Sequence, residues 1–125
     1  MLIVYDTLLG KTKKFAVKLA ELSDSHVRSV GDGPVSDPFL LVTYTIGFGQ
    51  VPESTTRFLE ASSDHMVGVA SGGNRAWGDN FAKAGVTISR EYDVPLVHQF
   101  ELEGTPSDLD TIMERLGELT CDIYN

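Results

Sequence analysis

Apolar residues fall along this chain in short runs separated by amphipathic stretches, a pattern that predicts strands and helices in alternation. Five runs have the length and composition of strands, at residues 2–5, 27–30, 39–44, 66–70 and 94–102. The run at 27–30 is short and weak and stops at a Gly-Asp-Gly-Pro turn, whereas the run at 39–44 is strongly apolar. Pro95 is expected to bend the last strand, because proline cannot donate an amide hydrogen to a sheet.

The first two stretches between these strands carry clear helical signals. Apolar residues recur at helical spacing from Phe15 to Leu22, with lysines and a glutamate between them. Pro52 and Glu53 are typical of a first helical turn, where a missing amide hydrogen is not needed and a negative charge is favourable. That helix is predicted to end near residues 62–64.

Two further helices are predicted in the second half of the chain. Residues 79–84 predict a short helix that stops at Gly85, since glycine is favoured just past a helix end. Ser107 or Thr105 is expected to cap the final helix. One face of that helix carries an apolar stripe made of Leu109, Ile112, Met113, Leu116 and Leu119.

The alternation of strands and helices predicts a single α/β domain. Repeated βαβ units require a parallel sheet with right-handed crossovers and helices on both of its faces. Five strands in 125 residues match the flavodoxin-like doubly wound fold, with strand order 2-1-3-4-5. In that order the loops after strands 1, 3 and 4 lie side by side at the switch point of the sheet, where such folds bind ligands.

Those three loops have the composition of ligand-binding loops. Each combines glycines, which allow close approach of the backbone, with hydroxyl or amide groups that form hydrogen bonds without charge. The first loop precedes a helix N-terminus, which is a natural anion site, and the other two add aromatic rings. The candidate ligand-binding residues are Thr7, Leu8, Gly10, Lys11, Thr12, Thr43, Tyr44, Thr45, Gly47, Phe48, Gly49, Ser71, Gly72, Gly73, Asn74, Trp77 and Gly78.

This combination favours a flat aromatic ligand that carries a phosphate, and flavin mononucleotide (FMN) is the best candidate. The loop at residues 7–12 would hold the phosphate, residues 43–49 would line one side of the isoalloxazine, and residues 71–77 the other. For each loop taken alone, a plain structural turn is the alternative. Trp77 is equally compatible with a core position, and for Arg75 a local carboxylate partner is favoured over a ligand.

Other classes of function fit the sequence less well. The net charge of −8 argues against nucleic acid, and no apolar stretch approaches the length of a membrane span. The only cysteine, Cys121, excludes an internal disulfide and is expected to be inert. The three histidines lack the spacing of a metal site. We therefore predict no catalytic residues and no metal ligands, and we expect a cytoplasmic protein without a signal peptide.

The sequence resembles the NrdI family, the small flavodoxin-like partners of class Ib ribonucleotide reductase. The resemblance runs from Leu2 to about Leu116 and is carried by Thr43-Tyr44-Thr45, Gly47-Phe48-Gly49, Val51-Pro52, Gly73-Asn74-Arg75, Trp77-Gly78, Phe100-Glu101-Leu102 and Gly104-Thr105. It implies an FMN protein that receives electrons from a flavin reductant and passes them to dioxygen. The superoxide-level oxidant would oxidise the dimanganese site of the reductase small subunit as its tyrosyl radical cofactor is assembled. The resemblance thus implies a redox accessory factor rather than a conventional enzyme.

Two departures from the family pattern fall in the predicted binding loops. The family usually has Thr-Gly-Asn where this chain has Leu9-Gly10-Lys11, and serine where it has Gly72. Leu9 removes a hydroxyl from the phosphate site, which the charge of Lys11 can offset. Two alternatives therefore stay open: a general electron-transfer flavodoxin, and a divergent member that has lost the flavin. Phe48, with Leu8 and Leu9, is expected to form an apolar docking patch for the reductase subunit.

Overall fold

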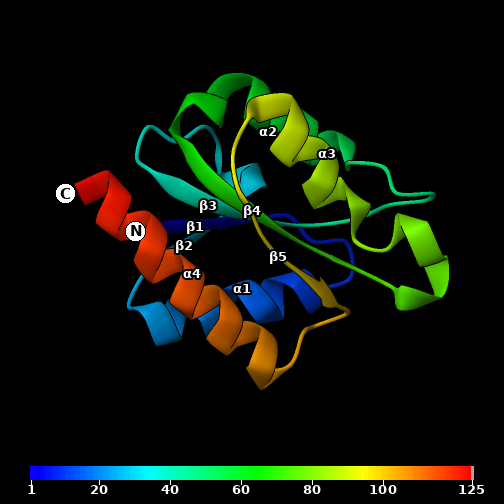
Figure 1. Cartoon of the computed structure of the whole chain (residues 1–125). Helices are drawn as coiled ribbons and strands as arrows, with labels where there is room; N and C mark the ends of the chain where they lie inside the picture. The colour runs from blue at the N-terminus through cyan, green and yellow to red at the C-terminus, as the bar shows by residue number, and fades with distance from the viewer. Residues whose placement is uncertain (125) are drawn as a thin grey trace.

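The computed structural model describes the backbone of residues 1–124 and the side chains of residues 1–119. Its centre is a parallel sheet in the order β2-β1-β3-β4-β5, which confirms the predicted topology (Figure 1). The strands are β1 (Leu2–Tyr5), β2 (His26–Ser29), β3 (Phe39–Tyr44), β4 (Met66–Gly73) and β5 (Leu96–Glu101).

Helices cover both faces of this sheet. One face carries α1 (Lys11–Ser23) and α4 (Pro106–Tyr124), and the other carries α2 (Glu53–Ser62) and α3 (Lys83–Tyr92) (Figure 1). Three short 3-10 turns complete the chain, η1 (Val30–Asp32), η2 (Ser63–His65) and η3 (Arg75–Asn80). Among the described residues, no helix combines the length and apolarity that crossing a membrane requires.

Alternate residues of the central strand β3 pack into two separate hydrophobic cores, one on each face of the sheet. Leu40 and Val42 pack in the cluster under α1 and α4, where the rings of Phe15 and Phe100 stack with centroids 4.0 Å apart. Phe39 and Leu41 point to the opposite side and pack in the cluster under α2 and α3. This twofold alternation is the geometry of a strand buried on both faces, and it explains why the run at 39–44 reads as continuously apolar.

The structure corrects the predicted helix at residues 79–84. Residues 75–80 form the 3-10 turn η3, and the helix α3 begins at Lys83, after Ala82 takes a positive φ of 49°. Gly85 lies inside this helix and does not stop it. A Cβ at Gly85 would lie 2.5 Å from Ser71 Oγ and 2.8 Å from Leu96 Cδ1, so glycine is needed here for close packing of α3 on the sheet.

Three strand boundaries also differ from the expected ones. β4 continues through Gly73 rather than ending at residue 70, because its last residues pair with both β3 and β5. β5 is shorter than expected and begins after Pro95, whose carbonyl still accepts a hydrogen bond from Val69 N at 3.0 Å. The weak strand lies one residue earlier than predicted, at His26–Ser29.

The cap of the last helix is Thr105, one of the two residues predicted for it. Its hydroxyl accepts a hydrogen bond from Asp108 N, and Asp108 Oδ2 accepts one from Thr105 N at 2.8 Å. This reciprocal pair satisfies two backbone donors at the start of α4. The predicted stripe faces the sheet as well, since Leu109, Ile112 and Leu116 are buried.

Candidate functional site

A cavity opens at the carboxyl end of the sheet, where the loops after β1, β3 and β4 meet. Its volume is about 690 Å³ including the solvent at its mouth, which is within the range of small-molecule sites. All three predicted loops contribute to its walls. The lining residues are Thr7, Leu8, Leu9, Lys11, Thr12, Tyr44, Thr45, Gly47, Gly72, Gly73, Asn74, Trp77, Asn80 and Leu102.

The loop after β1 presents a helix N-terminus to this cavity. Gly10 takes a φ of 93°, which only glycine adopts readily, and its amide donates to Thr7 Oγ1 at 3.0 Å. The first helical hydrogen bond of α1 runs from Lys14 N to Gly10 O. The amides of residues 11–13 precede it and have no intrahelical acceptor, so they are free to bind an anion at the positive end of the helix dipole.

The loop after β3 is a tight hairpin with a polar and aromatic lining. Ile46 and Gln50 exchange two backbone hydrogen bonds, at 3.0 and 2.8 Å, and close its base. Gly47 lies at the tip with a positive φ of 56° and lines the cavity. The tip peptides between Ile46 and Gln50 can therefore reorient while the base of the loop stays fixed, at a low steric cost for glycine.

Tyr44 ends β3 at the wall of the cavity and keeps its phenol proton. Burial raises the pKa of the Tyr44 phenol, and the nearby Asp6 carboxylate raises this pKa further, while a hydrogen bond with Ser54 opposes both effects. Tyr44 is therefore a neutral hydrogen-bond donor over the physiological pH range. Asp6 is itself buried and accepts hydrogen bonds from the hydroxyls of Ser54 and Thr55, which ties the end of β1 to the start of α2.

The loop after β4 brings bare backbone close to the site. A Cβ at Gly72 would meet the ring of Phe100 at 2.7 Å, and one at Gly73 would meet Ala82 N at 2.6 Å, so both positions need glycine for packing. Asn74 caps η3 by accepting from Ala76 N at 2.9 Å. Trp77 is half exposed rather than part of the core.

Most of the predicted binding residues line this cavity, but Thr43 and Ser71 do not. These two form a register pair between β3 and β4, and both are fully buried. The hydroxyl of Thr43 lies 3.0 Å from that of Thr55, and Ser71 Oγ donates to Ala82 O and accepts from Gly85 N. They therefore bind the sheet to α2 and α3. The structure also leaves four other predicted residues outside the cavity lining, namely Gly10, Phe48, Gly49 and Gly78.

Three lining residues were absent from the predicted set: Leu9, Asn80 and Leu102. Leu102 follows β5, which neighbours β4 in the sheet, so the strand order itself would have placed the loop after β5 beside the site. Asn80 belongs to the loop after β4, but the wrongly predicted helix at 79–84 includes it and so removes it from the predicted loop. Leu9 is a departure from the family pattern that lines the cavity without being among the predicted binding residues.

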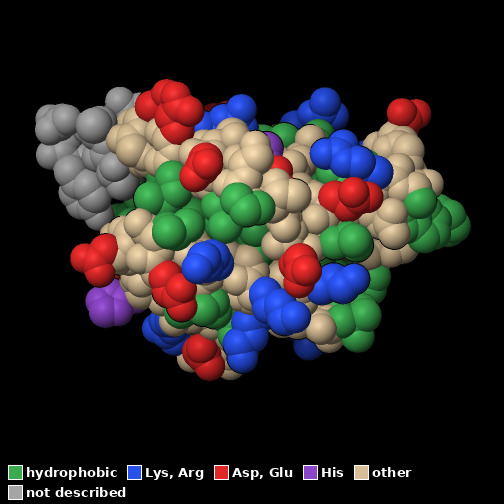
Figure 2. Space-filling model, turned by 90° about the horizontal axis from the view of Figure 1, so that it is seen from below, with side chains coloured by type: hydrophobic (Ala, Val, Ile, Leu, Met, Phe, Trp, Pro, Cys, Tyr) green, Lys and Arg blue, Asp and Glu red, His purple; other side chains and the backbone are tan. Residues whose placement is uncertain are grey.

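Exposed apolar side chains surround the mouth of the cavity. Phe48 is 73% exposed and packs edge-on against Trp77, with ring centroids 5.5 Å apart. We call the whole set the apolar rim, made of Leu8, Leu9, Ile46, Phe48, Trp77 and Leu102. Hydrophobic side chains gather at the right-hand end in Figure 2, the end at which the loop bearing η3 projects in Figure 1.

Arg75, close to the cavity, has local partners. Arg75 lies 4.5 Å over the ring of Phe81, and its backbone amide donates to Glu101 at 3.1 Å, as expected for an arginine with a local carboxylate. Among the described residues no three histidine, cysteine or acidic side chains are grouped as metal ligands. Cys121, predicted to be inert, lies outside the described side chains.

A doubly wound parallel sheet with a ligand-sized cavity at its switch point defines a flavodoxin-like protein. The sequence matches the family described as "NrdI Flavodoxin like" over residues 3–114, and the chain belongs to this family. Membership implies a flavodoxin-type flavin protein.

Solved structures support the fold. A short-chain flavodoxin associated with a PDU bacterial microcompartment has a TM-score of 0.81 and 17% identity, with 97% of this chain and 96% of that chain covered. A flavodoxin from the domain Archaea has a TM-score of 0.71 and 16% identity, with 99% and 98% covered. Oxidised flavodoxin 2 from Bacillus cereus has a TM-score of 0.69 and 18% identity, with 97% of each chain covered.

Proposed function

We propose that this protein binds one FMN in the cavity and serves the assembly of the dimanganese-tyrosyl radical cofactor of class Ib ribonucleotide reductase. The bound flavin would supply the chemistry, which is transfer of electrons from a flavin reductant to dioxygen to give a superoxide-level oxidant. The observation that carries the proposal is the meeting of three ligand-type loops at one cavity of suitable size, beside a helix with three free amides.

The first loop fits the phosphate of FMN. The free amides of residues 11–13 and the ammonium group of Lys11 supply donors and positive charge at one end of the cavity. Thr12 lies beside them and adds a hydroxyl. The first acidic side chain of α1 is Glu21, so no carboxylate in the first turn competes with the phosphate for these donors.

The other two loops fit a flat, largely apolar ring. Tyr44 and Trp77 come from opposite loops and both line the cavity, so they can contact the two faces of an isoalloxazine. Backbone amides and carbonyls also reach this space at Gly47, Gly72 and Gly73. There they can form hydrogen bonds with the polar edge of the ring. The neutral phenol of Tyr44 adds a donor that does not change charge over the physiological pH range.

The apolar rim fits a docking role. Phe48 and Leu9 are 73% and 85% exposed, which is unusual for side chains of this size on a protein that works alone. Their place around the mouth lets a bound partner close the cavity against bulk solvent. We propose that the partner is the small, dimanganese subunit of the reductase, so that the oxidant passes between the two proteins without dilution.

Binding of FMN is tested first, by titrating the flavin-free protein and following flavin fluorescence and absorbance. We expect saturable binding with a stoichiometry of about one and a Kd well below tens of micromolar. Riboflavin, which lacks the phosphate, is the matched control ligand and is expected to bind at least ten-fold more weakly. A colourless protein with no saturable binding would reject the flavin function in favour of a flavin-free divergent member.

The assembly role is tested with the manganese-loaded reductase subunit, the reduced protein and dioxygen. We expect tyrosyl radical, measured by electron paramagnetic resonance, in a yield far above that with dioxygen alone. Phe48→Ser is expected to lower this yield without changing FMN affinity, since Phe48 lies on the rim and does not line the cavity. Normal flavin chemistry with no radical would leave a general electron-transfer flavodoxin as the function.

A further inference from the structure

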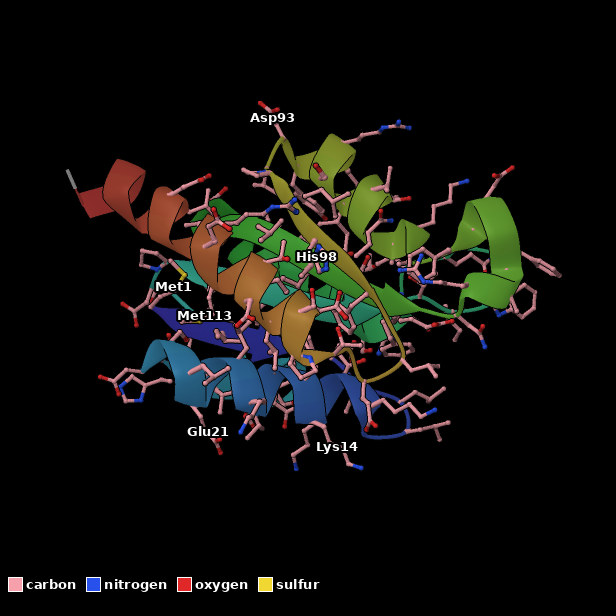
Figure 3. All side chains as sticks on the ribbon, turned by 60° about the horizontal axis from the view of Figure 1, so that its bottom comes forward. Met1, Lys14, Glu21, Asp93, His98 and Met113 are labelled. Carbon is pink, nitrogen blue, oxygen red and sulfur yellow. The ribbon has the colours of Figure 1, made fainter. Side chains whose placement is uncertain are left out.

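One side of α1 carries lysines of which the proposed function uses only Lys11. Lys11, Lys14 and Lys18 are spaced i, i+3 and i+7, so they share one helix face, and Lys13 flanks them. We call these four residues the lysine stripe. They are four of the chain's ten basic residues, and residues 11–18 contain no acidic one, although the whole chain has a net charge of −8. Lys14 projects from α1 away from the sheet (Figure 3).

The lysine stripe does not stabilise the helix that bears it. It lies in the N-terminal half of α1, where the helix dipole disfavours positive charge by about 0.3–1 kcal/mol for each residue of the first turn. Its ion pairs are long and exposed, with Lys14 at 3.8 Å from Glu103 and Lys18 at 3.9 Å from Glu21, so they add little. The stripe is therefore better explained by binding than by stability.

The position of the stripe relates it to the proposed redox site. Lys11 lines the cavity, and at 1.5 Å per residue the stripe reaches about 10 Å along α1 from the cavity mouth. Acidic residues adjoin the stripe at two points, Glu103 beside Lys14 and Glu21 beside Lys18, so the positive charge is concentrated in residues 11–18. A local positive field beside an electron-accepting site steers negatively charged partners toward that site.

We propose that the lysine stripe docks an acidic ferredoxin-type electron carrier, which is the reductant of this protein. This rests on the proposed function. Each encounter would oxidise the [2Fe–2S] cluster of the carrier by one electron, and two encounters with two protons from water would account for a two-electron reduction of a bound flavin. A groove around Val17 adds a small apolar contact to this charged surface, so we expect a mainly electrostatic and short-lived complex, as in electron-transfer encounters.

An anionic membrane is the competing partner, because exposed Leu8 and Leu9 lie beside the stripe. The net charge of −8 opposes approach to either anionic partner, but a small acidic protein can contact the stripe alone, whereas a flat lipid surface also faces the neighbouring carboxylates of Glu21 and Glu103. The acidic carrier is therefore favoured, and vesicles of phosphatidylserine and phosphatidylcholine serve as the second arm of the test.

Binding is measured by titrating the isotopically labelled, flavin-free protein with a plant-type [2Fe–2S] ferredoxin and following amide shifts by nuclear magnetic resonance. We expect the shifts to centre on residues 11–21 and the affinity to fall by about ten-fold or more from low to physiological salt. Lys14→Glu with Lys18→Glu is expected to weaken binding at least ten-fold. These changes place acidic residues nearer the positive end of the helix, so loss of folding is not expected.

The matched control is Arg57→Glu with Arg90→Glu, which changes the net charge equally on the helices of the opposite sheet face. We expect less than a two-fold effect from it. Equal losses in the two double variants, no ferredoxin binding, or binding of the vesicles alone would each overturn the proposal. In the flavin-loaded protein, reduction by ferredoxin is expected to slow in the lysine variant while reduction by dithionite does not change. If the protein binds no flavin, the proposed function is rejected. The ferredoxin titration uses the flavin-free protein, so it would still show whether the lysine stripe is a docking site.

Discussion

Leu9 is the main departure from the family pattern in the loop that we propose to hold the phosphate. It lines the cavity but is 85% exposed, so it neither packs in the core nor offers a hydrogen bond. We expect Leu9→Thr to tighten FMN binding by about three- to ten-fold, less than a fully buried charge-assisted bond because the site is solvated. Flavin fluorescence titration measures this.

Leu22→Thr is the control for that substitution, because Leu22 is an exposed leucine of α1 that does not line the cavity. It should leave the FMN affinity unchanged. If Leu9→Thr also has no effect, the free amides and Lys11 already saturate the phosphate, and the departure from the family pattern has no energetic consequence.

Asp108 makes the free energy of unfolding depend on pH through three hydrogen bonds, one with His98 and two with Thr105. Its Oδ1 lies 2.7 Å from Nε2 of His98, which belongs to β5 and is labelled in Figure 3, and its Oδ2 accepts hydrogen bonds from the amide and hydroxyl of Thr105. Burial acts to raise its pKa, but the hydrogen bonds from His98 and Thr105 outweigh burial and lower the pKa below its ordinary value near 3.8. The folded state therefore favours the ionised carboxylate, and this stabilisation is complete above the ordinary pKa and lost as the pH falls through the lowered one.

We expect Asp108→Asn to destabilise the protein at neutral pH by about 1 kcal/mol, mainly through the lost cap of α4. The difference from wild type should shrink in strongly acidic solution, where the wild-type carboxylate is protonated as well. Urea unfolding at a series of pH values measures both effects. Asp110→Asn, at an exposed position of the same helix, should show neither, and a pH-independent loss at Asp108 would contradict the linkage.

The packing of α3 on the sheet depends on Gly85, although helix propensity alone would favour alanine at this position. Gly85→Ala should gain about 1 kcal/mol from propensity, but the new Cβ would lie 2.5 Å from Ser71 Oγ in a tightly packed layer. We expect the clash to prevail, with a net loss of about 1–3 kcal/mol in the free energy of unfolding.

Gly117→Ala is the matched control for that prediction, since it tests the same substitution at an exposed position of α4. There an added Cβ meets no described atom within 4 Å, so we expect a small gain in stability. Urea denaturation compares the two variants. A gain in both would mean that α3 can shift away from the sheet at little cost.

The same glycine shows why the sequence predicts the elements better than their ends. Periodicity predicts the strands and the helices α1, α2 and α4, because most of them bury a regular face, and the alternation of strands and helices predicts the strand order. Gly85 is read from sequence as a stop, since the signal for a helix end and the signal for close packing are the same residue. The neighbour that decides between them, Ser71, is distant in sequence and reaches Gly85 only through the fold.

The candidate site follows the same rule at the level of single strand positions. Tyr44 and Gly72 form one register pair of β3 and β4 and line the cavity, whereas the preceding pair, Thr43 and Ser71, is buried. Successive residues of a strand face opposite sides of the sheet, so one position decides between ligand and core. The sequence is enough to locate the three loops. Only the register of β3 against β4 shows which of their hydroxyl groups face the cavity.

At the scale of the whole molecule, the cavity joins segments that the sheet alone does not hold together. A ligand in it contacts the loops after β1, β3 and β4, so it binds the folded state and not the unfolded chain. We expect FMN at one hundred times its Kd to add about 2.7 kcal/mol to the free energy of unfolding and to raise the Tm accordingly. Scanning calorimetry at several FMN concentrations measures this.

Riboflavin separates the contributions of ring and phosphate in that experiment. At the same concentration it should raise the Tm less, because it leaves the amides of residues 11–13 without an anion. Hydrogen exchange gives the local counterpart, since FMN should protect those amides and riboflavin should not. Equal effects of the two ligands would place the phosphate outside the α1 site.

The walls of the cavity are also spread along the whole length of the chain. Thr7 follows β1 and Leu102 follows β5, and within the described part of the chain β5 pairs with β4 alone. During synthesis the early loops leave the ribosome long before the last wall exists. A nascent chain that has not yet reached Leu102 therefore lacks one wall of the cavity. If flavin binds as proposed, its colour would report a chain that has been synthesised and folded through Leu102.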